Sequence, residues 1–246
     1  MDYPKNIIDS SIKTSRVQIN KIIEAVTMIE QSEKYHDDVM VSILIFSACK
    51  LLSQNINVSY LCYDELLEIP SSLTPVIDTV GIMRAIIAEC SKILIPIERE
   101  LQLVVNCKKT PVRINEKVFT LAVMNLLQNA LLYSPPKSSV VIEVYESCYN
   151  ICIEITNLIE FNSNSDNDEN SGLGIPLCNK IAARYNGNLE YVEIDGKTIT
   201  KLALPIANDS ISEEIQFSSE IIEYISERFK PTRLFMHEVV NKINHK

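Results

Sequence analysis

The first part of the chain has the apolar periodicity of two long helices. Between residues 5 and 32, apolar side chains recur at alternating steps of four and three, the spacing of a coiled-coil seam. The seam consists of Ile8, Ile12, Ile19, Ile22, Val26 and Ile29, with Ser15 as its one polar member. A second helical pattern follows at 37–68, after a short polar connection. This arrangement predicts an antiparallel hairpin whose apolar stripe is covered most simply by a second copy, giving a homodimeric four-helix bundle through residues 5–68.

The pattern changes after the segment 70–75, which contains two prolines and two serines and marks a domain boundary. Helices are predicted at 79–99, 116–132 and 173–185, and strands at 101–107, 140–148, 151–157, 189–194 and 197–204. Two strand pairs are predicted to form antiparallel hairpins, with turns at 149–150 and 195–196. The predicted fold class is α+β: a helical hairpin followed by an α/β sandwich, with helices on one face of a mixed, mostly antiparallel sheet.

Three parts of the chain are therefore expected. Residues 1–70 form the helical hairpin, residues 76–207 form the sandwich, and residues 208–246 form a C-terminal helical extension. The extension contains two amphipathic stretches, at 212–228 and 232–244. It either caps the sandwich or binds a partner, and its composition leaves both roles open.

The charge balance and the absence of a long apolar segment exclude several classes of protein. The chain has 23 Lys and Arg against 32 Asp and Glu, a net charge of −9, which argues against binding to nucleic acid or to an anionic membrane. Its most apolar stretch, 41–52, is interrupted by Lys50, so neither a signal peptide nor a membrane span is predicted. We expect a soluble, cytoplasmic protein whose seven cysteines are reduced.

The chain contains few glycines, and two of them lie close together at residues 172 and 174. An average composition of about 7% would give about 17 glycines, yet the chain has 5. Gly172 and Gly174 flank Leu173 just before a helical pattern. The backbone N–H groups at such a helix start can bind phosphate, although a tight loop entering a helix is an equally simple interpretation.

A polar stripe runs along the otherwise apolar helix predicted at 116–132. Asn125, Asn129 and the adjoining Tyr133 are spaced four residues apart, so they share one helix face. Buried amides need partners, and a magnesium ion shared with nucleotide phosphates could supply one. In the alternative interpretation, both amides form hydrogen bonds with the neighbouring backbone.

These motifs together resemble the ATPase family of histidine kinases and Hsp90-like proteins (GHKL). Residues 125–135 (NLLQNALLYSP) look like the family's asparagine box, and residues 172–181 (GLGIPLCNKI) look like its second glycine box. Residues 196–205 (GKTITKLALP) are similar to its closing strand. The predicted hairpin looks, more weakly, like the dimerisation and phosphotransfer domain of a sensor histidine kinase.

The resemblance implies ATP and Mg²⁺ as cofactors, and it implies roles for individual residues. Asn129 would be the magnesium ligand, Asn125 a partner on the phosphate side, Tyr133 a nucleotide contact, and Gly172 and Gly174 the hinge of a lid. The remaining nucleotide-binding residues implied by the resemblance are Asn157, Leu173 and Thr198.

The chain also departs from the family pattern around the expected nucleotide. The family has an Asp followed by a glycine pair, and the Asp accepts a hydrogen bond from the adenine amino group; here residues 157–160 are NLIE. An amide oxygen accepts that bond more weakly than a carboxylate does. Leu132 stands where the family often has a basic residue. Residues 138–179 contain seven carboxylates and no Lys or Arg, so this segment would repel a triphosphate unless magnesium screens it.

The histidine expected for autophosphorylation is missing. By the resemblance, the phosphoacceptor would lie near Lys13, where the chain has no histidine. His36, followed by Asp37 and Asp38, is the one candidate acceptor, because neighbouring carboxylates can orient an imidazole and raise its basicity. A solvated histidine near a helix start is the alternative.

Three functions are consistent with this sequence. The first is a degenerate two-component-signalling protein, a pseudokinase or phosphotransfer adaptor, that binds a response-regulator receiver domain or a partner kinase. The second is an active histidine kinase that uses Mg-ATP to phosphorylate His36 or a partner's histidine. The third is a purely structural dimer without a signalling partner.

Overall fold

The computed structural model describes residues 22, 29, 39–62, 67, 74–95, 98–107, 111–159, 172–208, 236 and 239–240. Several predicted features lie outside these residues: most of the first hairpin helix, the candidate acceptor His36, the polar segment 160–171 and most of the C-terminal extension. Within the described part of the chain, no helix has both the length and the apolarity needed to cross a membrane.

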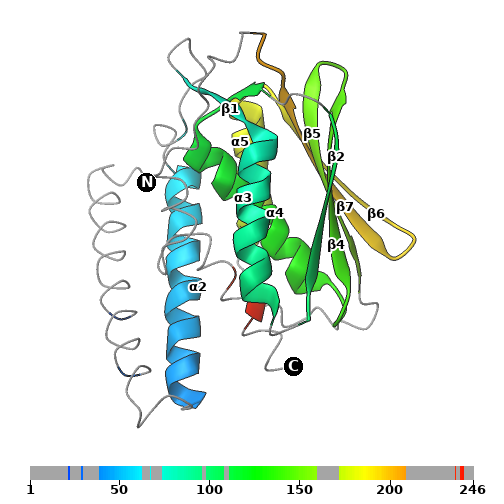
Figure 1. Cartoon of the computed structure of the whole chain (residues 1–246). Helices are drawn as coiled ribbons and strands as arrows, with labels where there is room; N and C mark the ends of the chain where they lie inside the picture. The colour runs from blue at the N-terminus through cyan, green and yellow to red at the C-terminus, as the bar shows by residue number, and fades with distance from the viewer. Residues whose placement is uncertain are drawn as a thin grey trace.

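The second helix of the predicted hairpin is α2 (Val39–Cys62), which stands beside the sandwich in Figure 1. It buries a stripe that includes Ala48, Leu52 and Ile56, at the four-residue spacing of one helix face. The described helix reaches Cys62 and lies within the predicted range 37–68. Lys180 Nζ donates to the carbonyls of Tyr60 at 3.3 Å and of Leu61 at 2.6 Å, so a cation from the sandwich caps the negative end of α2.

A five-stranded mixed sheet forms one layer of the sandwich, in the order β2-β4-β5-β7-β6 (Figure 1). Its strands are β2 (Glu100–Asn106), β4 (Ser139–Ser147), β5 (Asn150–Leu158), β6 (Asn188–Ile194) and β7 (Lys197–Pro205). The β2–β4 pair is parallel and the other three pairs are antiparallel. The predicted mixed, mostly antiparallel sheet is therefore confirmed.

Both hairpin turns have two residues with positive φ, as a tight hairpin requires. The turn between β6 and β7 lies at Asp195–Gly196, as predicted. The turn between β4 and β5 lies at Cys148–Tyr149, one residue earlier than predicted, because Ser147 pairs with Asn150. A second, two-stranded sheet of β1 (Val76–Asp78) and β3 (Pro111–Arg113) was not predicted, since three residues are too few to show a period.

Three helices cover one face of the large sheet: α3 (Thr79–Leu94), α4 (Glu116–Tyr133) and α5 (Gly174–Arg184) (Figure 1). The α3 helix ends before the predicted Arg99; Pro96 follows closely in the sequence and has no N–H to continue a helix. Asn115 caps the N-terminus of α4: its side chain accepts hydrogen bonds from the N–H groups of Lys117 and Val118.

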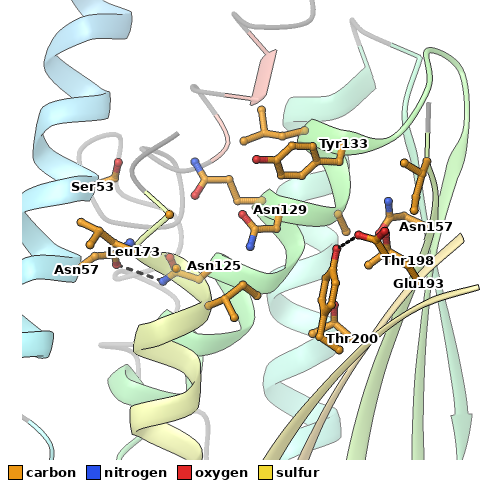
Figure 2. Close-up of a pocket in the computed structure, with 18 of the residues that line it drawn as sticks. Ser53, Asn57, Asn125, Asn129, Tyr133, Asn157, Leu173, Glu193, Thr198 and Thr200 are labelled. Atoms are coloured by element: carbon orange, nitrogen blue, oxygen red, sulfur yellow. Dashed lines mark hydrogen bonds between the residues drawn. The ribbon is translucent and has the colours of Figure 1, made fainter. Parts of the chain in front are cut away.

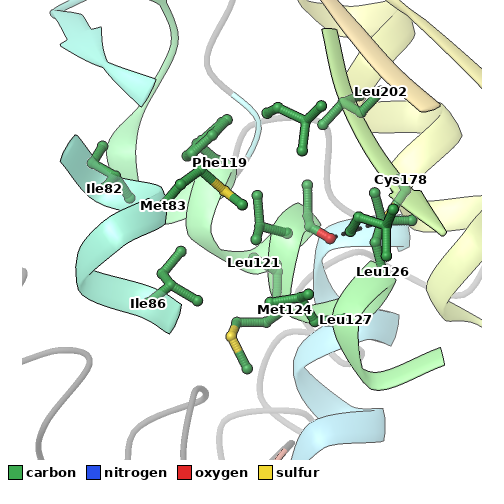
Figure 3. Packing of buried hydrophobic residues seen from close by; sticks show 14 of the residues in the cluster. Ile82, Met83, Ile86, Phe119, Leu121, Met124, Leu126, Leu127, Cys178 and Leu202 are labelled. Carbon is green, nitrogen blue, oxygen red and sulfur yellow. Dashed lines mark hydrogen bonds between the residues drawn. The ribbon is translucent and has the colours of Figure 1, made fainter. Parts of the chain in front are cut away.

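The core lies between this helical layer and the sheet, with α4 at its centre. Most of the residues of α4 are buried. Figure 3 shows Phe119 and Leu121 of α4 near Met83 of α3, with Cys178 of α5 and Leu202 of β7 on the other side. A helix surrounded in this way has little freedom to shift, so α4 holds its polar stripe in a fixed position.

The seven cysteines, all free thiols, differ in accessibility, which gives a direct test of the fold. Cys62 and Cys148 are exposed, whereas burial raises the pKa of the Cys90 thiol to about 12 and raises that of Cys178 as well. We expect N-ethylmaleimide at pH 8 to modify Cys62 and Cys148 first, because the thiolate is the reactive form. Peptide mass spectrometry measures the order. Modification of Cys90 or Cys178 as fast as Cys62 would contradict this packing.

Candidate functional site

A cavity of about 560 Å³ opens between α2, α4, the start of α5 and the strands β5, β6 and β7 (Figure 2). All eight residues expected to contact a nucleotide line it: Asn125, Asn129, Tyr133, Asn157, Gly172, Leu173, Gly174 and Thr198. The structure therefore brings together motifs that are up to 73 residues apart in the sequence. Their individual roles toward a nucleotide remain predictions.

The three members of the polar stripe on α4 have different surroundings. Asn125 is only 2% exposed, Asn129 is half-buried and Tyr133 is 40% exposed, so the stripe rises from the cavity floor to its rim. In Figure 2 the Asn129 side chain lies between the other two. No hydrogen bond joins the Asn129 amide to another described residue, which leaves its oxygen and nitrogen available to a ligand.

Asn125 is already bonded. Its amide and that of Asn57 on α2 form a reciprocal pair, in which Asn57 Nδ2 donates to Asn125 Oδ1 at 2.8 Å and Asn125 Nδ2 donates to Asn57 Oδ1 at 3.2 Å (Figure 2). Asn125 Nδ2 also donates to the Leu121 carbonyl at 2.9 Å, the backbone bond foreseen in the alternative interpretation. Sequence reasoning did not identify Asn57, which is 68 residues away and carries no local signal.

The two glycines of the Gly-x-Gly loop are required for different structural reasons. Gly172 has φ +62°, a conformation that side-chain-bearing residues rarely adopt. At Gly174, an added Cβ would lie 3.0 Å from Asn125 Oδ1, so the first turn of α5 approaches the amide pair closely. The N-cap residue of α5, Leu173, makes no side-chain hydrogen bond to the helix N-terminus. The positive end of α5 therefore lies at the cavity beside Asn125.

At the sheet side of the cavity, one row of residues crosses three strands. Asn157 of β5 is paired with Thr198 of β7, which is paired with Glu193 of β6, so the three side chains share a face. Asn157 is 4% exposed and donates from Nδ2 to the Leu158 carbonyl at 2.9 Å. Glu193 accepts a hydrogen bond from the Tyr191 hydroxyl, and burial together with this bond raises the pKa of Tyr191.

The charge on the described lining of the cavity is negative. Among the described residues that line it, Glu193 is the one carboxylate and none is Lys, Arg or His. No group of three or more His, Cys, Asp or Glu suited to a metal ion occurs in the described ranges. A divalent cation would therefore need ligands from a bound molecule in addition to the Asn129 amide, which fits a metal that arrives with phosphates.

The fold is similar to that of solved histidine kinases. The structure is similar to histidine kinase AdeS of Acinetobacter baumannii, with 16% sequence identity and a TM-score of 0.55; the match covers 77% of this chain and 96% of the solved AdeS chain. It is also similar to full-length ShkA, solved in complex with AMPPNP, with 16% identity and a TM-score of 0.65; the match covers 85% of this chain and 47% of ShkA. At this identity the likeness establishes the fold, in agreement with the resemblance in the asparagine and glycine boxes.

Comparison by sequence alone finds no counterpart. No family model matches the chain, and no curated protein matches it either. The similarity to the solved histidine kinases is therefore one of fold.

Proposed function

We propose that the chain is a two-component-signalling protein related to histidine kinases, a degenerate pseudokinase or phosphotransfer adaptor that binds a response-regulator receiver domain. The observation that carries this proposal is the composition of the cavity. Its described lining has a carboxylate and no basic side chain, and the Asn125 amide is bonded to Asn57. Phosphoryl transfer depends on cationic groups that stabilise the transferring phosphate, so a cavity of this kind is a poor catalyst.

The cavity nevertheless fits a nucleotide with its metal. Asn129 would hold Mg²⁺ through its amide oxygen, and the start of α5 would lie near the phosphates. The bound ion would screen phosphate charge. With no cation among the described lining residues, we expect Mg-ADP, which carries less charge, to bind at least as well as Mg-ATP.

The experiment that tests receiver binding uses the purified full chain. Receiver domains encoded in the same genome are titrated against the immobilised protein by interferometry. We expect at least one to bind with a micromolar Kd in the absence of ATP, because an adaptor needs no nucleotide chemistry to hold its partner. Absence of binding by every receiver domain would leave the structural-dimer hypothesis in its place.

Exposed apolar side chains support the predicted homodimer. Leu44 and Leu51 on α2 are 48% and 54% exposed, and Ile22 and Ile29 are exposed as well. Each pair is separated by seven residues, the repeat of a helix–helix seam, so one stripe per helix is available to a second copy.

Introducing negative charge at Leu44 and Leu51 should therefore convert the dimer into monomers. The double variant Leu44→Asp/Leu51→Asp is expected to have the 27.9 kDa mass of one chain in light scattering, and the unmodified protein twice that mass. Val104→Asp is the matched control, because Val104 is also exposed but lies on β2. A monomeric unmodified protein would contradict the dimer.

An active kinase is the second candidate function. The amide of Asn129 has no hydrogen-bond partner among the described residues, and the Gly172-Leu173-Gly174 loop lies beside it at the same cavity, as an ATP site would require. In that case His36, which lies outside the described residues, or a histidine of a partner would receive the phosphate.

A further inference from the structure

The end of the cavity formed by the sheet is unusually rich in hydrogen-bond acceptors. Asn157, Thr198 and Glu193 lie side by side on β5, β7 and β6, and Figure 2 shows them together at one end of the site. Strands are about 4.8 Å apart, so the backbone positions of the row span about 10 Å across the sheet.

The chemistry of this row favours a donor group on the ligand. Asn157 uses Nδ2 for the Leu158 carbonyl, and Oδ1 makes no hydrogen bond to a described residue although the side chain is 4% exposed. Glu193 can only accept, and it has lone pairs left beyond the bond from Tyr191. A ligand edge with N–H donors would satisfy both, whereas a carbonyl in the same place would face an oxygen of like charge.

The opposite end of the cavity sets the direction in which a nucleotide can lie. The start of α5 and the Asn129 amide are on the helix side, away from Glu193 (Figure 2). Phosphates are attracted to a helix N-terminus and repelled by a carboxylate. The base is therefore directed to the sheet and the phosphates to α5.

From this arrangement we propose that Glu193 is a specificity-determining residue that accepts a hydrogen bond from the exocyclic amino group of a bound purine nucleotide. In this chain the carboxylate comes from β6, two strands away from Asn157, the position where the resembled family has its Asp. The inference rests on the nucleotide site proposed above, and it concerns which base that site selects.

The test compares nucleotides that differ in the amino group. Mg-ADP, Mg-GDP and Mg-IDP are titrated calorimetrically into the full chain, since adenine and guanine carry an exocyclic amino group and hypoxanthine does not. We expect ADP or GDP to bind about tenfold more tightly than IDP, because a hydrogen bond to a carboxylate is a strong one. Comparing the Kd of Mg-ADP with that of Mg-GDP shows which of the two purine bases the site prefers.

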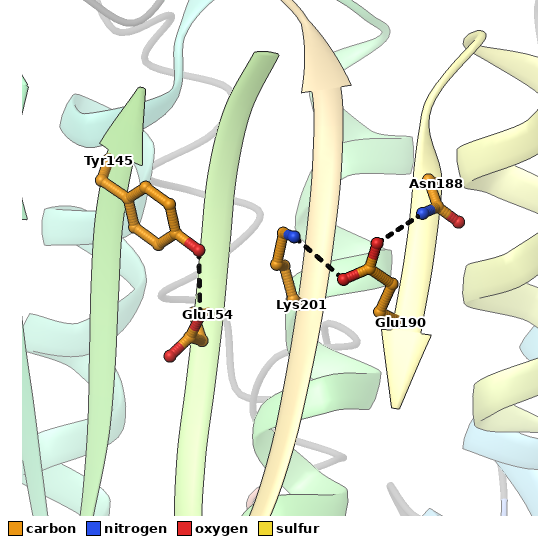
Figure 4. A network of polar contacts seen from close by, with 5 residues as sticks. All are labelled: Tyr145, Glu154, Asn188, Glu190 and Lys201. Atoms are coloured by element: carbon orange, nitrogen blue, oxygen red, sulfur yellow. Dashed lines mark hydrogen bonds and ion pairs between the residues drawn. The ribbon is translucent and has the colours of Figure 1, made fainter. Parts of the chain in front are cut away.

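Variants separate the role of Glu193 from a structural one. Glu193→Gln should reduce the preference over IDP to about twofold, and Asn157→Asp added to it should restore the preference by returning a carboxylate to β5. Glu190→Gln is the matched control: Glu190 is on the same strand but bonds Lys201 and Asn188 on the opposite face of the sheet (Figure 4). It should leave the preference unchanged.

Two results would overturn the inference, and only one of them would also overturn the proposed nucleotide site. If ADP or GDP binds and Glu193→Gln keeps the full preference over IDP, Glu193 does not contact the base, while the nucleotide site stands. If no nucleotide binds at millimolar concentration, the nucleotide site fails together with the inference. Thermal unfolding of each variant shows that a lost preference is not a lost fold.

Discussion

Replacing Asn129 with alanine is expected to weaken the binding of Mg-ADP by at least about tenfold. The Asn129 amide is half-buried, lines the cavity and has no hydrogen bond to another described residue, so alanine removes a ligand group without leaving a protein partner unsatisfied. Interactions with charged groups are worth about 1.5–3 kcal/mol, which corresponds to about tenfold to a hundredfold in Kd. Calorimetric titration measures the change directly.

The control for this variant is Asn106→Ala. Asn106 lies at the end of β2 and bonds Glu143 at 2.5 Å on the exposed surface, and it does not line the cavity. Both variants should unfold at nearly the same temperature as the unmodified chain. Equal Mg-ADP affinity in Asn129→Ala and Asn106→Ala would show that the α4 stripe does not contact the ligand.

Replacing Asn57 with alanine is expected to lower the free energy of unfolding by about 1–3 kcal/mol. The change removes both bonds of the reciprocal pair and leaves Asn125, which is 2% exposed, with an unsatisfied acceptor and one unsatisfied donor. It also removes a contact between α2 and the sandwich, so we expect α2 to become more accessible to amide exchange. Chemical denaturation gives the free energy.

Gln54→Ala provides the comparison for Asn57→Ala. Gln54 is an amide on the same helix, is half-buried and lines the same cavity, but it has no hydrogen bond to a described residue. Its loss should change stability by less than about 0.5 kcal/mol. If Gln54→Ala and Asn57→Ala destabilise the protein equally, the amide pair does not hold α2 in place.

The elements of the sandwich could be predicted because each has a strong local signal. The Asp195–Gly196 turn is a clear hairpin signal, and the apolar period of α4 extends over five turns. The Cys148–Tyr149 turn was misplaced by one residue because neither residue is a typical turn former. The β1–β3 pair was missed because its strands are stabilised by distant partners and contain only three residues each.

The site was predictable in part. Residues of the Asn and Gly boxes were identified, and the structure places all of them at one cavity. Asn57 could not be found, since its partner Asn125 is 68 residues away in another predicted domain. Glu193 could have been found: a two-residue turn at Asp195–Gly196 fixes the register, and that register places Glu193 opposite Thr198 on the cavity face.

The two ends of the cavity differ in their suitability for a nucleotide: the sheet end is the proposed base end, and the end beside α5 is the proposed phosphate end. The base end has good acceptors, so recognition of a nucleotide is chemically reasonable. The phosphate end lacks a described basic side chain, and α2 is bonded to Asn125 close to where phosphates would lie. In the function proposed here, such a site would bind a nucleotide and report its presence through α2, but it would be poorly equipped to transfer a phosphoryl group.

Incubation of the purified chain with Mg²⁺ and ATP labelled at the γ-phosphate tests the central claim most directly. A degenerate kinase predicts no acid-labile label on the protein above the level of a heat-denatured sample. Label that appears with time and disappears in His36→Ala would contradict the account and establish an active histidine kinase.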